Sequence, residues 1–343
     1  PAAREPRLTL RRAVEEGELL FASRAWVCAP IADLTTCVVE RLQACTESEY
    51  ACFMCEAAGE ELLRAMFELP DTAASADGPS TGSRSAPRAV RDVDSARVEQ
   101  RLRRCAVALD ALNEHGAAQP AALAGAWLPV LLLGHSCVPS VQYAIHGDLL
   151  VCRAASALPA GAELCVGYVS TIQPLHLRRE GLLRDFGLAC ACARCRLEEL
   201  VTDRAAAEDV LRRLDGVSDG LAAGMDLQAA CSAFEGLAAD VEALARDALQ
   251  VLARRGADDA AMSDACGGLA LELGPAGGDA PAGRAADRLR SLLCGSFVAC
   301  FKAAAFAHKR LHDHARSAAA YERCLELLEE VARGGAFHAF WAA

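Results

Sequence analysis

Short apolar runs separated by turn residues predict strands in two parts of this chain. Near the start, Leu8-Thr9-Leu10 has an extended pattern, and Gly17 follows two acidic residues, as in a turn between strands. Within residues 126–170, apolar stretches again alternate with turn residues. Further turns are expected at Gly134, His146-Gly147-Asp148 and Pro159-Ala160-Gly161. These two parts are the candidate β-structure of the chain.

An apolar residue at every third or fourth position predicts helices elsewhere. We expect helix through most of residues 34–69 and over residues 93–113. The helical spacing resumes at Pro174, and after Cys195 nearly all of the chain has it. The apolar face expected within 93–113 contains Val98, Leu102, Cys105, Leu109 and Leu112. The chain is therefore predicted to be α+β, with an all-α C-terminal part.

Two segments are predicted to interrupt these elements. Residues 70–92 are rich in Ser, Ala, Pro, Gly and Asp and cannot bury a core, so we expect a loop or a disordered insert. Residues 274–283 are a Gly/Pro-rich break between helices. In the last helical pair, Ala305, Ser317 and Cys324 bracket Tyr321 at a spacing that resembles a tetratricopeptide repeat. An ordinary antiparallel helix pair fits that pattern equally well.

Composition and charge narrow the classes of function. Hydrophobic residues make up 53% and charged residues 24%, which is typical of globular proteins. The net charge of -11 and the lack of a long Lys/Arg run argue against direct nucleic-acid binding, and they are compatible with a basic peptide partner. The apolar run Ala126–Leu133 is too short to span a membrane. We expect a monomer, cytoplasmic and/or nuclear, without membrane association.

The 17 cysteines are interpreted as reduced thiols and metal ligands, because disulfide frames are typical of small secreted chains. Cys190, Cys192 and Cys195 place three sulfurs within six residues, which suits a tetrahedral zinc ion. Three ligands do not close a structural zinc site, so a fourth must come from elsewhere. The alternative is a chance cluster in a cysteine-rich chain.

A second motif, Gly134-His135-Ser136-Cys137-Val138-Pro139-Ser140, precedes this cluster, and Gly161-Ala162-Glu163-Leu164 and Tyr168 lie between the two. Together they resemble the catalytic end of SET-domain protein methyltransferases. In that family the first motif is Asn-His-Ser-Cys-x-Pro-Asn, and the cysteine cluster follows the active-site tyrosine. The resemblance runs from Trp127 to Cys195 and is to the SET-and-MYND type.

The resemblance implies methyl transfer from S-adenosylmethionine to a lysine of a protein or peptide. Tyr168 would be the catalytic residue and, with Phe186, would line the substrate channel. Cys137 would complete a structural Zn2+ site with Cys190, Cys192 and Cys195. The residues implied to contact the cofactor are Gly134, His135, Ser136, Asn113 and Leu188.

Four departures from the family pattern fall at cofactor-binding positions. Glu5-Pro6-Arg7 stands where the family has Gly-x-Gly, whose glycines let backbone approach the cofactor closely. Gly134 and Ser140 replace the two asparagines of the motif, and Leu188 replaces an aromatic residue. Each lost hydrogen bond costs about 0.5–1.5 kcal/mol. A catalytically inactive SET-fold scaffold, binding peptides or proteins through its helical domain, is therefore the alternative function.

A third interpretation, a cysteine-rich helical scaffold with no SET core, predicts no zinc and little strand. The MYND finger of the subfamily is predicted to be absent or degenerate, because its place holds one Cys-x-x-Cys and no His. The thiols there are Cys28, Cys37, Cys45, Cys52 and Cys55, expected to be small buried hydrophobes.

The expected organisation follows from the resemblance. The SET β-fold would contain a pseudoknot, an exception to the usual topology rules, and would be followed by a post-SET zinc site and a helical domain similar to tetratricopeptide repeats. The expected divisions are 1–30 for the first SET part, 31–92 for the insert, 93–189 for the SET core, 190–196 for the zinc motif and 197–343 for the helical domain.

Overall fold

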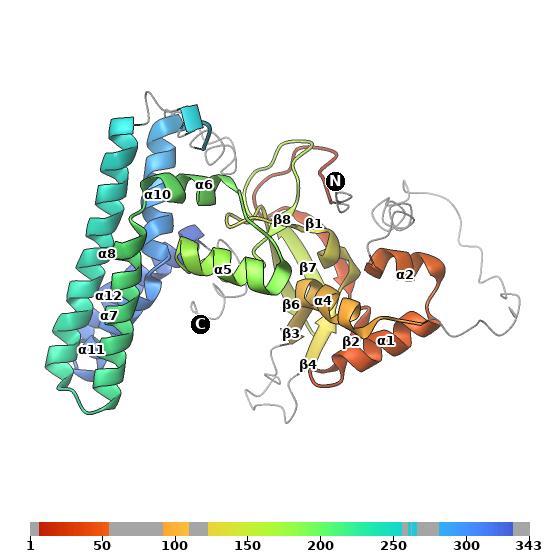
Figure 1. Ribbon diagram of the computed structural model, residues 1–343, viewed down its shortest axis with the longest axis horizontal. Coiled ribbons are helices and arrows are strands. Elements are labelled where there is room, and N and C mark those ends of the chain that lie inside the picture. Colours follow the sequence, from red (N-terminus) through yellow and green to blue (C-terminus); the bar gives the residue numbers. More distant parts are fainter. Residues whose placement is uncertain are drawn as a thin grey trace, which may run out of the picture. The chain divides into compact units, whose positions relative to one another are not determined.

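The computed structural model shows a mixed helix-and-strand protein (Figure 1). Its contacts divide the chain into two compact units. The first contains residues up to 8, 21–133 and 145–151, and the second contains 9–20, 134–144 and 152–343. The structure describes residues 7–54, 92–109, 123–255, 260–261, 263–265 and 281–331. Outside these residues lie 70–91 of the loop predicted at 70–92, Asn113, and most of the break predicted at 274–283.

The first unit is built on an antiparallel sheet of order β2-β4-β3. Its strands are β2 (Val27–Pro30), β4 (Leu123–Ala126) and β3 (Ala106–Leu109), with Cys28 and Val107 both opposite Gly125. A Cβ atom on Gly125 would lie 2.5 Å from the buried Trp127 ring, so only glycine leaves room for that indole. The helical elements of this unit are α1 (Leu34–Ala44), α2 (Glu47–Met54), α4 (Ser95–Cys105) and the 3-10 helix η1 (Leu128–Leu132).

The predicted helix over 93–113 is only half right. Asp94 begins α4 by accepting backbone hydrogen bonds from Ala96 and Arg97, but the helix ends at Cys105. The next four residues are strand β3, paired with β4. Pairing with a strand from elsewhere in the chain determines the backbone here, and the local apolar spacing does not contain that information.

A second sheet has the order β1-β7-β6, formed by β1 (Leu19–Arg24), β7 (Leu149–Ala154) and β6 (Val141–His146). The predicted turns at Gly17 and at 146–148 are present. Gly17 has φ +77° and Gly147 has φ +61°, a left-handed conformation that glycine adopts at little cost. The strands expected around the turn at 146–148 are present as β6 and β7. Leu8-Thr9-Leu10 forms only an isolated bridge, from Thr9 to Glu163, and Gly134, where a turn was expected, begins a short strand instead.

Two very short parallel strands of the second unit position candidate site residues. Strand β5 (Gly134–His135) pairs with β8 (Cys165–Val166), so residues thirty positions apart become neighbours. The Ser140 hydroxyl extends this pairing. It accepts from the Cys165 N–H at 2.8 Å and donates to the Glu163 carbonyl at 3.1 Å.

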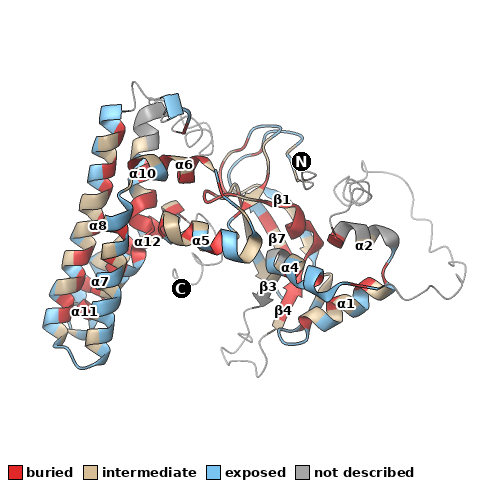
Figure 2. Ribbon diagram, viewed as in Figure 1, coloured by how far each residue is buried: buried red, intermediate tan, exposed pale blue. Residues whose placement is uncertain are grey.

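Helices predominate among the described residues after Pro174, as the sequence predicts for the C-terminal part (Figure 1). Long α8 packs against α7, α10 and α11, and α12 packs against α10 and α11. Apolar residues such as Leu237, Val241 and Leu289 line the buried faces (Figure 2). The helices are α5 (Leu175–Phe186), α6 (Ala193–Val201), α7 (Arg204–Ala222), α8 (Leu227–Arg255), α10 (Pro281–Gly295), α11 (Val298–Arg310) and α12 (His314–Val331).

Among the described residues, no single helix has both the length and the apolar character needed to cross a membrane. The pair 286–295 and 298–310 reaches that length and composition only when joined, and it bends by 58° at the break.

Candidate functional site

Four cysteines converge in the second unit. The sulfur atoms of Cys137, Cys190, Cys192 and Cys195 all lie within 4.8 Å of one another, and those of Cys137 and Cys195 are 3.5 Å apart. Zn–S bonds of about 2.3 Å place tetrahedral sulfurs about 3.8 Å apart. Cys192 is half-buried and the others are buried. The geometry and the all-thiol donor set are compatible with structural zinc.

Two separate segments supply these thiols. Cys137 follows β5, in the loop that Ser140 fastens to β8. Helix α5 ends at Gly187, whose φ of +61° reverses the chain direction while its N–H bonds the Leu183 carbonyl. The chain then has no regular secondary structure as far as Cys192, and Cys195 lies in the first turn of α6. The fourth ligand is thus fifty residues away in sequence, which is why only a family resemblance identifies it.

The electrostatics of the cluster favour thiolate at Cys137. Hydrogen bonds from Cys190, Cys192 and Cys195 lower the pKa of Cys137 well below its ordinary range, although burial opposes this shift. Arg178 donates to the Cys195 sulfur at 3.9 Å and pairs with Glu198 at 2.6 Å. This buried guanidinium places a positive charge beside the thiolates that a metal needs as ligands.

Arg194, inside the cysteine motif, connects the cluster to its surroundings. Its Nε donates to Glu198 at 2.7 Å, and its Nη1 donates to the carbonyls of Cys137 at 3.1 Å and Thr171 at 2.9 Å. Its Nη2 bonds the Leu292 carbonyl and Ser296 on and beside α10. Sequence reasoning missed Arg178, Arg194 and Glu198. The available signal was an Arg/Glu pair four residues apart on the apolar side of α6.

Beside the cluster lies a row of three rings, from His135 through Tyr168 to Phe186. The ring centroids are 5.3 Å and 5.1 Å apart. The Tyr168 backbone N–H donates to His135 Nδ1 at 3.1 Å, and His135 Nε2 lies 3.5 Å from the Cys137 sulfur. The histidine ring is therefore engaged by the protein on both nitrogens, and it fixes the backbone that carries Tyr168.

The structure describes some of the remaining predicted cofactor residues, and the others lie outside the described part of the chain. Gly134 and Ser136 flank His135, and their backbone N–H groups donate to the carbonyls of Leu164, just before β8, and of Val166 in β8. Leu188 packs, half-buried, against the cysteine cluster. Asn113, Glu5 and Pro6 lie outside the described residues. Arg7 is described, and its Nη1 donates to the Leu133 carbonyl at 3.4 Å.

The thiols at the expected MYND position do not join a metal-ligand cluster in the part of the chain that the structure describes. Cys45 is buried, with its sulfur 3.3 Å from the Leu42 carbonyl, whereas Cys28 is exposed. Cys37 is half-buried. Cys55 and the side chain of Cys52 lie outside the description.

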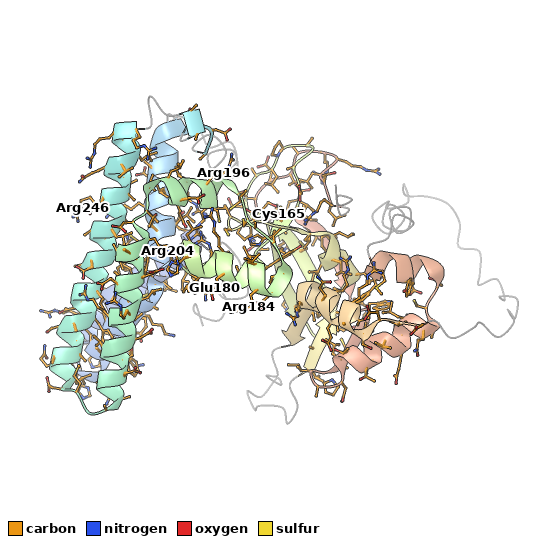
Figure 3. All side chains as sticks on the ribbon, in the orientation of Figure 1. Cys165, Glu180, Arg184, Arg196, Arg204 and Arg246 are labelled. Carbon is orange, nitrogen blue, oxygen red and sulfur yellow. The ribbon has the colours of Figure 1, made fainter. Side chains whose placement is uncertain are left out.

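A cavity of about 510 Å³ opens between α5, α6, α7 and α10 of the second unit. Glu180 on α5 and Arg204 on α7, both labelled in Figure 3, lie on its wall. The ion pair of Arg179 with Glu199, at 2.7 Å, adds charge to the same wall. Tyr168 does not line it, so this cavity is separate from the aromatic row.

Comparison with known proteins finds relatives that are similar to part of this chain. No family model matches the chain. It is 35% identical over 66 residues to histone-lysine N-methyltransferase SET5 of Eremothecium gossypii, covering 19% of this chain and 14% of that protein. It is 30% identical over 79 residues to mouse histone-lysine N-methyltransferase SMYD3, covering 23% and 18%. Chicken N-lysine methyltransferase SMYD2 is 30% identical over 70 residues, covering 20% and 16%.

These matches support a SET-and-MYND-type protein, in agreement with the resemblance carried by the motifs. The matched segments span less than a fifth of the length of each of these relatives. The relatives are lysine methyltransferases by name.

Proposed function

We propose that this protein transfers a methyl group from S-adenosylmethionine to a lysine side chain of a protein. The observation that carries the proposal is the row of His135, Tyr168 and Phe186 beside the four-cysteine cluster. The similarity to lysine methyltransferases supports the reaction class. The net charge of -11 favours a substrate segment of basic character.

The proposal includes the finer architecture. The parallel pairing of β5 with β8, and the bonds of Ser140 to the strand that follows Glu163, would form the pseudoknot of a SET core. Cys190, Cys192 and Cys195 would be the post-SET ligands of a structural zinc closed by Cys137. That ion would hold the segment after α5 against the loop that carries His135.

The residues of the row suit a positively charged reaction centre, because aromatic faces attract cations. S-adenosylmethionine, when bound, supplies an electrophilic methyl group on a sulfonium. The Tyr168 hydroxyl would orient the neutral lysine amine for attack in line with the departing sulfur. Phe186 would exclude water on one side, and His135 would keep the Tyr168 backbone in place through its 3.1 Å hydrogen bond.

The second candidate function is a non-catalytic scaffold. The loss of both motif asparagines, at Gly134 and Ser140, favours it, and so does the charged cavity between α5, α6, α7 and α10. The Ser140 hydroxyl is already hydrogen-bonded to the Glu163 carbonyl and the Cys165 N–H. In this function the cavity would hold a segment of a partner protein.

Calorimetric titration of zinc-loaded protein with S-adenosylmethionine separates the two candidates, because only the enzyme needs to bind it. Methyl transfer is then followed on an array of lysine-containing peptides. We expect Tyr168→Phe to lower kcat by about 10²–10³-fold, the usual cost of one preorganised donor, with cofactor affinity retained. Tyr143→Phe, at a half-buried tyrosine on β6, is the matched control and should keep wild-type activity. No binding by folded, zinc-loaded protein would exclude the enzyme.

A further inference from the structure

Away from the cysteine cluster, a second group of potential metal ligands joins two helices of the bundle. Cys231 and Glu235 lie one turn apart on α8, and His308 lies on the adjacent helix α11. The Cys231 sulfur is 3.6 Å from Nδ1 and 3.9 Å from Nε2 of His308. The same Nε2 is 3.0 Å from Oε1 of Glu235. One thiol, one imidazole and one carboxylate thus converge.

We propose that Cys231, Glu235 and His308 bind a zinc ion, with water as the fourth ligand. Sulfur, nitrogen and oxygen from these three residue types are the donors that zinc takes in proteins. Bond lengths of about 2.0–2.3 Å put the ligand atoms of a tetrahedral site about 3.3–3.6 Å apart. With Nε2 as the ligand nitrogen, its separations of 3.9 Å from the Cys231 sulfur and 3.0 Å from the Glu235 oxygen lie on either side of that range, and all three ligand atoms lie within 4.8 Å of one another. Side-chain adjustments within these limits would bring them around an ion.

Burial gives the site a closed side and an open side. Cys231 and His308 are buried, whereas the Glu235 side chain is 44% exposed. Water would therefore reach the ion from the Glu235 side and complete the coordination. A three-ligand site with one open position differs from the closed four-thiol cluster near Tyr168.

An outer residue already orients the carboxylate. Nη1 of Arg316, on α12, is 3.7 Å from the Glu235 oxygen that faces His308. Ligating carboxylates are commonly held by such outer partners, which fix the ligand atom and tune its affinity. The site would thus clamp α8 to α11, with α12 bracing it.

This site is independent of the proposed methyl transfer. The test is the zinc content of the full chain after loading and dialysis, measured by mass spectrometry for wild type, Cys231→Ser and Cys300→Ser. Cys300, a buried thiol on α11 outside the ligand group, is the matched control. We expect Cys231→Ser to hold one zinc fewer than the other two proteins. All other thiols are shared, so their zinc cancels in the difference.

The variant Glu235→Gln provides a second test. The Glu235 side chain is 44% exposed, so this substitution should not prevent folding. We expect it to release the corresponding zinc to a competing chelator at least about tenfold more readily than wild type does. Equal zinc content in wild type and folded Cys231→Ser would overturn the proposal. If Cys231→Ser does not fold, unchanged zinc affinity in Glu235→Gln overturns it instead.

Discussion

Arg194 shows how one side chain can hold several segments at once. Its guanidinium is fully buried and has donors directed to Glu198, to the carbonyls of Cys137 and Thr171, and to the end of α10. A planar guanidinium can serve so many acceptors because its donors point outward in a fixed plane. The residue therefore determines where the Cys137 loop lies relative to α6 and α10.

Replacing Arg194 by Met should lower the free energy of unfolding by about 3–5 kcal/mol. The substitution removes one of the two buried arginines that pair with Glu198 and leaves the carbonyls of Cys137 and Thr171 without this donor. Breaking a buried ion pair has costs of this size. The matched control is Arg184→Met, at an exposed arginine on α5 whose pair with Asp185 is screened by solvent and contributes little to stability. Urea unfolding of both variants measures the difference. A loss under 1 kcal/mol for Arg194→Met would contradict the assigned role.

At the residue scale, sequence reasoning predicted the metal-ligating cysteines but not the buried charged side chains around them. Three clustered cysteines indicate a metal by spacing alone, and the family resemblance added Cys137. Arg178 has no such signal, because charged residues on a helix are usually exposed, and Arg194 and Glu198 are indicated only by their four-residue spacing on the apolar side of α6. Their burial follows from packing that the sequence pattern does not contain.

At the scale of elements, α8 packs against three other helices of the bundle, α7, α10 and α11. Its carboxylate Glu242 accepts hydrogen bonds from Arg290 on α10 and Arg323 on α12, each at 2.9 Å. Burial alone would raise the pKa of Glu242, but Arg323 and Arg290 lower it below its ordinary 4.5. One partly buried side chain thus joins three helices electrostatically.

The Glu242 pairing should stabilise the bundle only while the carboxylate is ionised. A lowered folded-state pKa gives stability that is complete above pH 4.5 and is lost as pH falls through the folded value. Glu242→Gln should cost up to about 1 kcal/mol at neutral pH, and its difference from wild type should shrink below pH 4.5. Glu322→Gln, at an exposed glutamate on α12, controls for the lost charge. A difference that grows on acidification, measured by thermal melting, would refute this assignment.

Secondary-structure elements were predictable where a local sequence signal, such as apolar residues at helical spacing over many positions, determines them. The C-terminal helices follow from apolar spacing, and turns at Gly17 and Gly147 follow from residue type. Strand β3 did not, because Ala106–Leu109 becomes a strand only by pairing with β4. The parallel contact of β5 with β8 is equally non-local, and the local sequence pattern does not predict it.

At the scale of the whole molecule, the cysteine cluster and the helical bundle belong to one compact unit. All four thiols lie within residues 134–144 and 152–343, together with α5 to α12. Arg194 bonds both the Cys137 loop and the end of α10. Loss of the cluster is therefore expected to affect helices that contribute no ligand.

Removing the proposed structural zinc with a strong chelator should expose amides of β5, β8, α5 and α6 to hydrogen exchange. In small zinc-dependent domains the ion contributes about 10–16 kcal/mol, more than most domains have in reserve. Without it, the four thiols lose their common partner, and the loop that carries His135 loses its link to α6. Sheet β2-β4-β3 of the other unit contains none of the four ligands and is the internal control. Because the chelator also empties the proposed Cys231 site, the comparison is repeated in Cys231→Ser. Equal loss of protection in both units, or no loss in α5 and α6, would show that the cluster is not a structural metal centre.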